Sequence, residues 1–328
     1  MINRDNWKLT KEFLRDRYKY DQLSPKSLRL EETWLRYLLE WAREITFDHV
    51  DNKNLKFTEY LKSARLNGEE KPFSTIYTKK VLATSRRFFI WLRTKKKGYR
   101  NKIDSDFIST LKTQRFTYDF KEHEAIDLEE VIAISKAPVE NMREKRIRAA
   151  AVFWFLSGIR IGAFVTLPIR AINLEESSIK QFTSLGVKTK FGKNETTYLL
   201  NIPGLIDVVK DWDDLVRKNL SEENYWFAPL SPETCWFDKD IKEAGNNRTS
   251  RAYKDLKEWL EKVGLPFHSP HKFRHGHAVY SIKVANTVAE LKAISQNLMH
   301  SNLSITDGIY GILSREDRKN YITNLGKK

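Results

Sequence analysis

Apolar side chains recur at helical spacing over most of this chain, and that periodicity limits what it can fold into. Leu30, Trp34, Leu38 and Trp41 follow one another at intervals of three or four residues, as on one face of a helix. Ser24-Pro25 predicts where this helix begins, because serine caps helices and proline suits the first helical position. The pattern predicts a mainly α protein.

Further helices are expected over residues 57–67, 75–97 and 104–111, with the second of these ending at Gly98. Its inward face is predicted to carry Ile76, Val81, Leu82, Phe88, Phe89 and Leu92. Residues 1–23 predict a short helix without defined bounds. Four helices with short turns predict a small bundle, which we assign to a domain spanning residues 1–118.

Residues 119–126 are expected to form a linker, since this charged stretch lacks periodicity. Asp127, followed by acids in the first turn, predicts the start of a new helix. From there a mostly helical domain is expected over residues 127–328. Its one break is residues 178–202, whose β-branched and aromatic residues predict short strands joined by a hairpin.

The net charge of +15 indicates a polyanionic partner. Residues 1–120 carry 27 Lys+Arg and 16 Asp+Glu, a net of +11, whereas the other residues carry 31 and 27, a net of +4. The predicted helix over residues 75–97 contributes the cations Lys79, Lys80, Arg86, Arg87, Arg93, Lys95, Lys96 and Lys97. We expect this helix to contact DNA phosphates, although cations near its end also suit the helix dipole.

One cysteine, Cys235, excludes an intramolecular disulfide and a cysteine metal cluster. No stretch approaches the roughly 18 apolar residues of a membrane span. The sequence therefore predicts a cytoplasmic protein that does not contact a membrane.

Chemistry-bearing residues follow one another from the middle of the chain to its end. Arg160 closes the apolar run 149–159 at a Gly-Ile-Arg corner, from which a guanidinium could reach a phosphate. Lys188, Lys190 and Lys193 crowd the predicted hairpin turn. Taken alone, the arginine fits a surface ion pair and the lysines fit a solvated loop.

His271 and Arg274 lie three residues apart behind Pro270, on one face of an expected helix. His271 and His275 also have the spacing of two zinc ligands. The cation Arg274 between them disfavours a metal, so the sequence predicts phosphate recognition and no metal or other cofactor. His300 and Tyr310 follow further along the chain.

The order Arg160, hairpin lysine, His271-x-x-Arg274, His300, Tyr310 resembles the tyrosine recombinase family, which includes the phage integrases. The match covers about residues 120–328, and residues 1–118 look like the family's core-binding, SAM-like bundle. Two positions depart from the family. Met299 stands where glycine is common, which we interpret as a packing change, and Ala163 replaces an acid that often follows the first arginine.

The resemblance implies roles for these residues. Tyr310 would attack the scissile phosphate, with Tyr321 as a weaker candidate, and His271 would act as general base. Arg160 and Arg274 would stabilise the phosphorane, His300 would donate a hydrogen bond to it, and a hairpin lysine would protonate the leaving oxygen. Lys190 fits the family pattern best, with Lys188 and Lys193 still open.

The resemblance also implies partners. Two protomers would bind each double-stranded DNA site and four would form the synapse, with accessory DNA-bending proteins as a further partner class. The tail, residues 314–328, would pack on a neighbouring protomer. We expect an integrase or transposase of a mobile element, with a chromosome-dimer resolvase as the near alternative.

Two other classes remain open at this point. A type IB topoisomerase uses a similar residue set to relax DNA without specific sites. A catalytically silent DNA-binding protein would keep the charge without the tyrosine chemistry.

Overall fold

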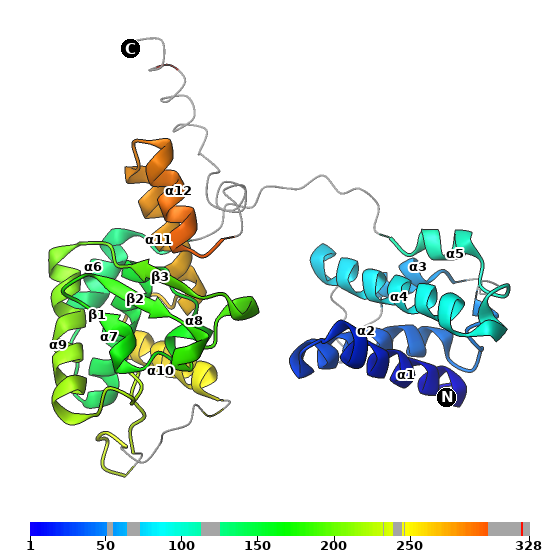
Figure 1. Ribbon diagram of the computed structural model, residues 1–328, viewed down its shortest axis with the longest axis horizontal. Helices are drawn as coiled ribbons and strands as arrows, with labels where there is room; N and C mark the ends of the chain where they lie inside the picture. The colour runs from blue at the N-terminus through cyan, green and yellow to red at the C-terminus, as the bar shows by residue number, and fades with distance from the viewer. Residues whose placement is uncertain are drawn as a thin grey trace. The chain divides into compact units, whose positions relative to one another are not determined.

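The computed structural model describes residues 1–50, 55–63, 73–112, 125–231, 233–238, 245, 247–300 and 323. It divides into two compact units, Met1–Phe120 and Lys121–Lys328 (Figure 1). The predicted mainly α architecture with one small sheet is confirmed. Within the described residues, no helix combines the length and apolar character that a membrane crossing needs.

Helices build the first unit, in which the first, second and fourth pack on one another (Figure 1). The described helices are α1 (Arg4–Asp21), α2 (Pro25–Ala42), α3 (Phe57–Ser63), α4 (Thr75–Lys95) and α5 (Ser105–Thr110), with a 3-10 turn at Lys97–Tyr99. The expected helix in residues 1–23 is present as α1, but with 18 residues it is longer than predicted. With α1, the described part of this unit has five helices, whereas the predicted bundle had four.

Side-chain caps fix where these helices begin. The Oγ of Ser24 accepts a hydrogen bond from the Ser27 backbone at 3.2 Å, and Pro25 follows in the first turn, as predicted. At α4, the Oγ of Ser74 accepts from the Tyr77 backbone at 3.2 Å. The predicted end of the helix over 57–67 lies outside the described residues.

The first unit has an aromatic core that α1 completes. Phe13 meets Phe88 and Trp91 of α4 edge-on, each with ring centroids 5.5 Å apart. The Trp91 indole also donates to Asp16 at 2.8 Å. The inward face predicted for α4 is correct except at Ile76, which is 64% exposed because the neighbouring Tyr77 faces Tyr37 and Phe73 instead.

The second unit combines several helices with a small sheet. Its longer helices are α6 (Leu128–Lys136), α7 (Met142–Ser157), α9 (Pro203–Asn219), α10 (Arg248–Lys262), α11 (Pro270–Val284) and α12 (Val288–Asn297). Short elements complete it: α8 (Ile161–Phe164), 3-10 turns at Ile169–Ala171, Thr183–Leu185 and Lys190–Gly192, and strands β1 (Ile172–Asn173), β2 (Ser178–Gln181) and β3 (Glu195–Tyr198).

Asp127 caps α6 in a capping box with Glu130, as the acids in the sequence predict. Most of the expected linker lies outside the described residues. Its last residue is not part of a linker, because Ile126 is 1% exposed and belongs to the second core. A Cβ on Gly276 of α11 would come within 2.3 Å of the Ile126 carbonyl oxygen, so glycine permits this contact.

Helix α7 forms the centre of the second unit. Residues 149–157 are all buried, and α7 packs against α6, α9, α10 and α11. A helix enclosed in this way is a rigid base for whatever follows its C-terminus. That end leads directly to Arg160.

The strands form an antiparallel sheet in the order β1-β2-β3. Strands β2 and β3 lie in the predicted range 178–202, and Ser178 pairs with Tyr198. The two-residue strand β1 precedes that range and was not predicted, because two residues show no alternation.

Candidate active site

Arg160 stands at a corner formed by the end of α7. Gly158 terminates this helix with a φ of +60°, and its backbone N–H bonds the Trp154 carbonyl at 3.0 Å. Gly158 is needed for two reasons. Its positive φ favours glycine, and a Cβ would come within 2.6 Å of the His277 ring and 2.9 Å of Leu298. Arg160 then becomes the N-cap residue of α8 and is half-buried.

Arg274 joins this corner to two other helices. It lies on α11, is 3% exposed, and donates to the carbonyl oxygen of Gly158. Its second terminal nitrogen donates to the Leu298 carbonyl at 2.6 Å and lies 3.1 Å from Nε2 of His300. The guanidinium therefore holds the end of α7, the end of α12 and the His300 ring together.

His300 reaches this place through a left-handed turn. Helix α12 ends at Asn297, and Met299 adopts a φ of +52°. The His300 backbone N–H then bonds the Ser295 carbonyl at 3.0 Å. Interpreting Met299 as a packing change is wrong. The backbone itself favours glycine at this position, and a methionine there costs roughly 1–2 kcal/mol.

Several cations act on the His300 imidazole. Burial lowers its pKa to about 4, with further lowering by Arg274, Arg160, Lys193 and Lys190 in that order. The ring is therefore neutral at pH 7, which allows Nε2 to accept a hydrogen bond from Arg274. Four of the residues singled out in the sequence thus share one electrostatic environment with His300.

The lysines lie in the loop between β2 and β3, as predicted. Lys188, Lys190 and Lys193 are all exposed. The base of the loop is tied to the Arg160 region, because the Lys188 backbone N–H donates to Oγ1 of Thr166 at 2.9 Å. Thr166 lies just beyond α8 and is 3% exposed. No pattern in the sequence predicts the contact between Lys188 and Thr166.

Asn297 links the His300 turn to the same sheet. Its side-chain oxygen accepts from the Tyr198 backbone N–H at 2.6 Å, and its amide nitrogen donates to the Tyr198 carbonyl at 3.0 Å. This pair of bonds resembles one rung of an antiparallel ladder at the edge of β3. Arg160, the lysine loop and His300 are therefore tied to one framework.

His271 occupies the first turn of α11, one turn before Arg274, and is exposed. Its ring meets that of His275 edge-on at a centroid distance of 4.4 Å. No group of three metal-ligating side chains occurs among the described residues. The predicted nucleophile Tyr310, the alternative Tyr321 and all of residues 314–328 except Thr323 lie outside the described part.

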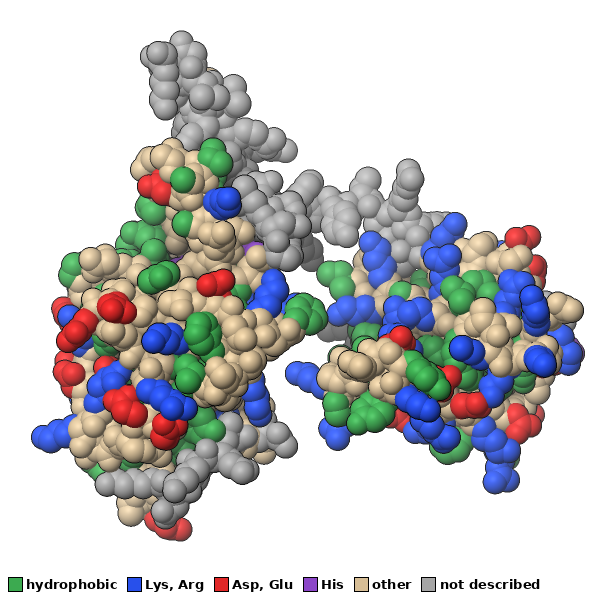
Figure 2. Space-filling model, in the orientation of Figure 1, with side chains coloured by type: hydrophobic (Ala, Val, Ile, Leu, Met, Phe, Trp, Pro, Cys, Tyr) green, Lys and Arg blue, Asp and Glu red, His purple; other side chains and the backbone are tan. Residues whose placement is uncertain are grey.

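The cations predicted to contact DNA lie on α4 of the first unit or directly after it, because α4 ends at Lys95 and is followed by its C-cap residue Lys96 and by Lys97 in the 3-10 turn. The surface of this unit is rich in Lys and Arg (Figure 2). Within it, Arg87 donates to Glu31 at 2.9 Å, and Lys96 pairs with Glu12. The exposed residues Lys80, Arg86, Lys95 and Lys97 remain the stronger candidates, while Lys79 is exposed as well and Arg93 is half-buried. Lys79, Arg86 and Arg87 line a shallow hollow of about 560 Å³.

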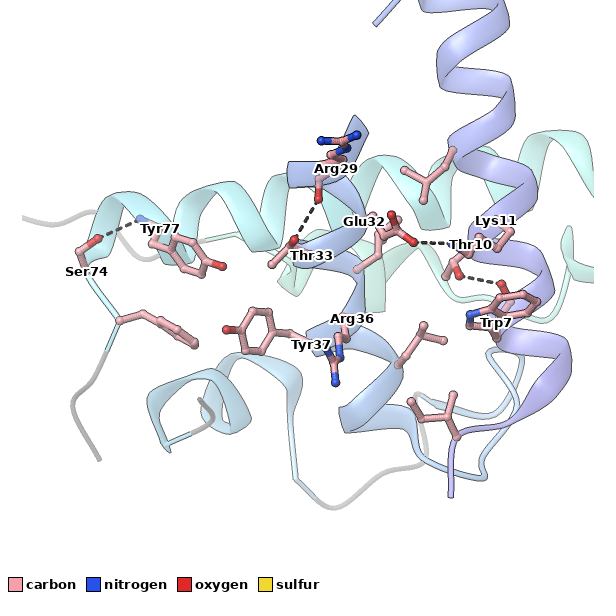
Figure 3. Close-up of a pocket in the computed structure, with 15 residues that line it drawn as sticks. Trp7, Thr10, Lys11, Arg29, Glu32, Thr33, Arg36, Tyr37, Ser74 and Tyr77 are labelled. Carbon is pink, nitrogen blue, oxygen red and sulfur yellow. Dashed lines mark hydrogen bonds and ion pairs between the residues drawn. The ribbon is translucent and has the colours of Figure 1, made fainter. Parts of the chain in front are cut away.

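A separate hollow of about 910 Å³ lies between α1, α2 and the start of α4 (Figure 3). Trp7, Tyr37 and Tyr77 line it, and Lys11 pairs with Glu32 at its wall. Burial and a hydrogen bond with Tyr37 raise the pKa of Tyr77 to about 12. The described lining contains none of the cations predicted to contact DNA.

The phage integrase family model matches residues 124–316, more than half of the chain. This protein therefore belongs to the phage integrase family, the tyrosine recombinases. The match begins just before α6 and includes every residue of the candidate site.

Curated relatives agree with this assignment. Tyrosine recombinase XerC of Natranaerobius thermophilus is 25% identical over 269 residues, covering 82% of this chain and 79% of the relative. XerC of Roseiflexus castenholzii is 25% identical over 196 residues, covering 58% of this chain and 56% of the relative. The chain thus spans little more than half the length of the latter.

Solved structures share the fold. The XerH site-specific recombinase bound to its palindromic difH substrate has a TM-score of 0.64 and 16% identity, covering 97% of this chain and 84% of that one. A lambda integrase dimer bound to a COC′ core site also has a TM-score of 0.64, with 13% identity and coverage of 94% and 95%. The Tn1549 transposon integrase in complex with transposon right end DNA has a TM-score of 0.61, 14% identity and coverage of 99% and 100%.

Proposed function

We propose that this protein is a site-specific DNA recombinase that cuts and rejoins double-stranded DNA through a 3′-phosphotyrosyl intermediate. The observation that carries the proposal is the shared environment of His300, in which Arg274 contacts the ring and Arg160, Lys190 and Lys193 lower its pKa. Fixed cations around a neutral imidazole suit a pentavalent phosphate, whose negative charge grows in the transition state.

In the proposed reaction the phenol oxygen of Tyr310 attacks the scissile phosphorus and gives its proton to His271. The bond from phosphorus to the 5′ oxygen breaks, and Lys190 protonates that oxygen. Arg160 and Arg274 neutralise the phosphorane, while His300 donates to a nonbridging oxygen. The phosphotyrosine bond keeps the energy of the phosphodiester, so strand rejoining needs no ATP.

The arginines and the lysine also supply the positive charge that a metal would otherwise provide. Their positions around His300 support metal-independent cleavage. Arg274 stands between His271 and His275 on α11, and its positive charge disfavours a metal ion there. We therefore assign both histidines to proton transfer and phosphate recognition.

Assembly on DNA is part of the same proposal. The DNA-bound XerH, lambda and Tn1549 structures support DNA as partner, and the lambda integrase dimer on a core site supports a dimer on each site. Four protomers would form the synapse, assisted by accessory DNA-bending proteins where the site requires them. The role proposed is that of a mobile-element integrase, with resolution of chromosome dimers as the near alternative.

The test is covalent adduct formation in EDTA on duplexes selected for binding from a random library and then nicked at successive positions. Wild type is expected to form an adduct at one defined step. Tyr310→Phe should lose the adduct while retaining binding, because a single hydroxyl adds little to affinity. Tyr321→Phe is the matched control and should react normally.

Three outcomes would refute parts of this proposal. Adducts in Tyr310→Phe that disappear in Tyr321→Phe would move the nucleophile. A requirement for zinc would favour the metal site. Cleavage at every nick, without preference for the selected sequence, would indicate a type IB topoisomerase.

A further inference from the structure

Phe191 combines a left-handed backbone conformation, which phenylalanine does not favour, with an apolar side chain exposed to water. Its φ and ψ are +62° and +23°, and Gly192 follows with a φ of +64°. These angles fit the first central residue of a type I′ turn, at about +60° and +30°, where Asn-Gly is the preferred pair. A phenylalanine in this conformation costs roughly 1–2 kcal/mol.

The ring gains little from the protein in return. Phe191 is 85% exposed, so its apolar surface faces water. The ammonium group of Lys190 lies 5.1 Å from the ring centroid, and Lys193 follows two residues later. Backbone strain combined with an exposed ring indicates that Phe191 contacts another molecule.

The loop that carries Phe191 is fixed at both ends. On one side, Lys188 is bonded to Thr166 at 2.9 Å. On the other, the Asn194 side chain accepts from the backbone and the hydroxyl of Thr183 at 2.7 and 3.0 Å. These contacts hold the turn in place relative to the sheet.

The turn also lies beside the candidate active site, because Lys188 is bonded to Thr166 just beyond α8, the helix whose N-cap residue is Arg160. The charges of Lys190 and Lys193 act on the His300 imidazole, as expected at this location. A scissile phosphate near His300 would therefore lie within reach of the two lysines that flank Phe191. The nearest apolar surfaces on the DNA are the faces of the bases beside that phosphate.

We infer that Phe191 stacks on a base of the target duplex at the step next to the scissile phosphate. The inference rests on the proposed recombinase function and adds a contact to it. Lys190 and Lys193 neutralise the backbone while the ring replaces part of the base stack. Base–aromatic stacking contributes about 1–3 kcal/mol, and apolar wedges of this kind unstack and kink DNA.

The decisive variant is Phe191→Asn, which gives the turn its preferred sequence and removes the ring. Its melting temperature should equal or exceed that of wild type, while affinity for the selected duplex should fall roughly 5- to 150-fold. Phe191→Leu keeps an apolar side chain without an aromatic face and should lose affinity similarly. Phe191→Trp should retain it, and Trp236→Ala, at an exposed aromatic elsewhere in the unit, should not change it.

A local probe reports stacking directly. Single 2-aminopurines are placed at each step around the cleavage position, and fluorescence is measured in a Tyr310→Phe background so that no strand is cut. Binding should change the fluorescence at one step beside the cleavage position, and Phe191→Asn and Phe191→Leu should remove that change.

Unaltered affinity and fluorescence in Phe191→Asn, or wild-type behaviour of Phe191→Leu, would overturn the inference. Adduct formation on the same duplex by the chain with Tyr310 intact separates this result from the proposed function. Adducts without a Phe191 effect refute only the stacking. A Phe191 effect without adducts refutes only the chemistry.

Discussion

The two units differ in whether they bury arginines. In the described part of the first unit the buried charged group is an acid: Glu31 is 4% exposed, and Arg17 and Arg87 reach it from the surface at 2.9 Å each. The second unit buries acids such as Asp255 and also buries arginines, with Arg146 and Arg274 at 4% and 3% exposed. The first unit keeps most of its α4 cations at the surface, whereas the second uses arginines to build its interior.

This difference has a consequence for function. Exposed cations contribute sequence-independent, salt-sensitive affinity for phosphates. Buried arginines fix backbone positions instead, as Arg274 does for the carbonyls of Gly158 and Leu298. We therefore expect changes at the exposed cations of the first unit to alter DNA affinity, and changes at the buried arginines of the second unit to alter stability and chemistry.

The largest expected effect is at Asp255, whose side chain is fully buried and contacts Arg143, Arg146 and Arg251 at 2.8, 2.7 and 3.0 Å. Asp255→Asn should lower the free energy of unfolding by about 3–5 kcal/mol, because it leaves buried Arg146 without a counter-charge. Glu31→Gln should cost less, about 1–3 kcal/mol, since water reaches its arginines. Calorimetry of the full chain measures both, and equal losses would contradict the comparison.

Acid should destabilise the second unit through His277. This side chain is 1% exposed, and burial lowers its pKa to about 4 although its Nδ1 bonds the Phe155 carbonyl at 2.8 Å. Between pH 6.5 and 4 the His277 imidazole is protonated in the unfolded chain but stays neutral in the folded chain. Stability should therefore decrease with falling pH, by up to about 1.4 kcal/mol per unit.

His277→Asn keeps a donor for the Phe155 carbonyl and removes the titration. Chemical unfolding at pH 7, 6 and 5 should therefore show a weaker pH dependence in this variant than in wild type. An unchanged slope would mean that the acid sensitivity arises at other groups.

Local patterns allowed much of the helical framework to be predicted, because caps and apolar periodicity act within a few residues. Ser24-Pro25 and Asp127 marked helix starts that the structure bears out. The same local reasoning predicted a helix in residues 1–23 but not its length, because the polar sequence of α1 shows little of the packing of Phe13 on α4. Tertiary packing decides that element.

The candidate site shows the same limit. Residue types and spacing identified Arg160, Arg274 and His300, because few other roles combine those side chains in that order. The sequence offered no comparable pattern for Thr166 or Asn297, whose bonds to Lys188 and Tyr198 join segments far apart in the chain. The left-handed turn at Met299 could not be predicted from the sequence either, because methionine does not favour a positive φ.

That turn gives the smallest predicted effect. Met299→Gly should relieve the strained backbone and stabilise the chain by about 0.5–1 kcal/mol, after the greater freedom of glycine in the unfolded chain is counted. Gln22→Gly is a matched variant in the first unit, where Gln22 ends α1 with a φ of +51°. Both should raise the melting temperature slightly, but only Met299→Gly should alter strand cleavage, because only Met299 orients His300. An equal effect of both variants on cleavage would contradict this role.

We expect surface cations of the first unit to bind DNA while residues of the second unit perform the chemistry. Titration of adduct formation against protein concentration at several salt concentrations separates the two roles. Replacing Lys80, Arg86, Lys95 and Lys97 by alanine should reduce the log–log salt slope of binding by up to about 0.9 per contact. The rate at saturating protein should not change.

Two comparisons complete that titration. Alanine at the ion-paired Arg87 and Lys96 should change the slope less. Arg160→Lys should leave the slope unchanged and reduce the saturated rate by about 10²-fold or more, because lysine lacks the planar fork. A quadruple variant with an unchanged salt slope, or with a saturated rate as low as that of Arg160→Lys, would contradict the account.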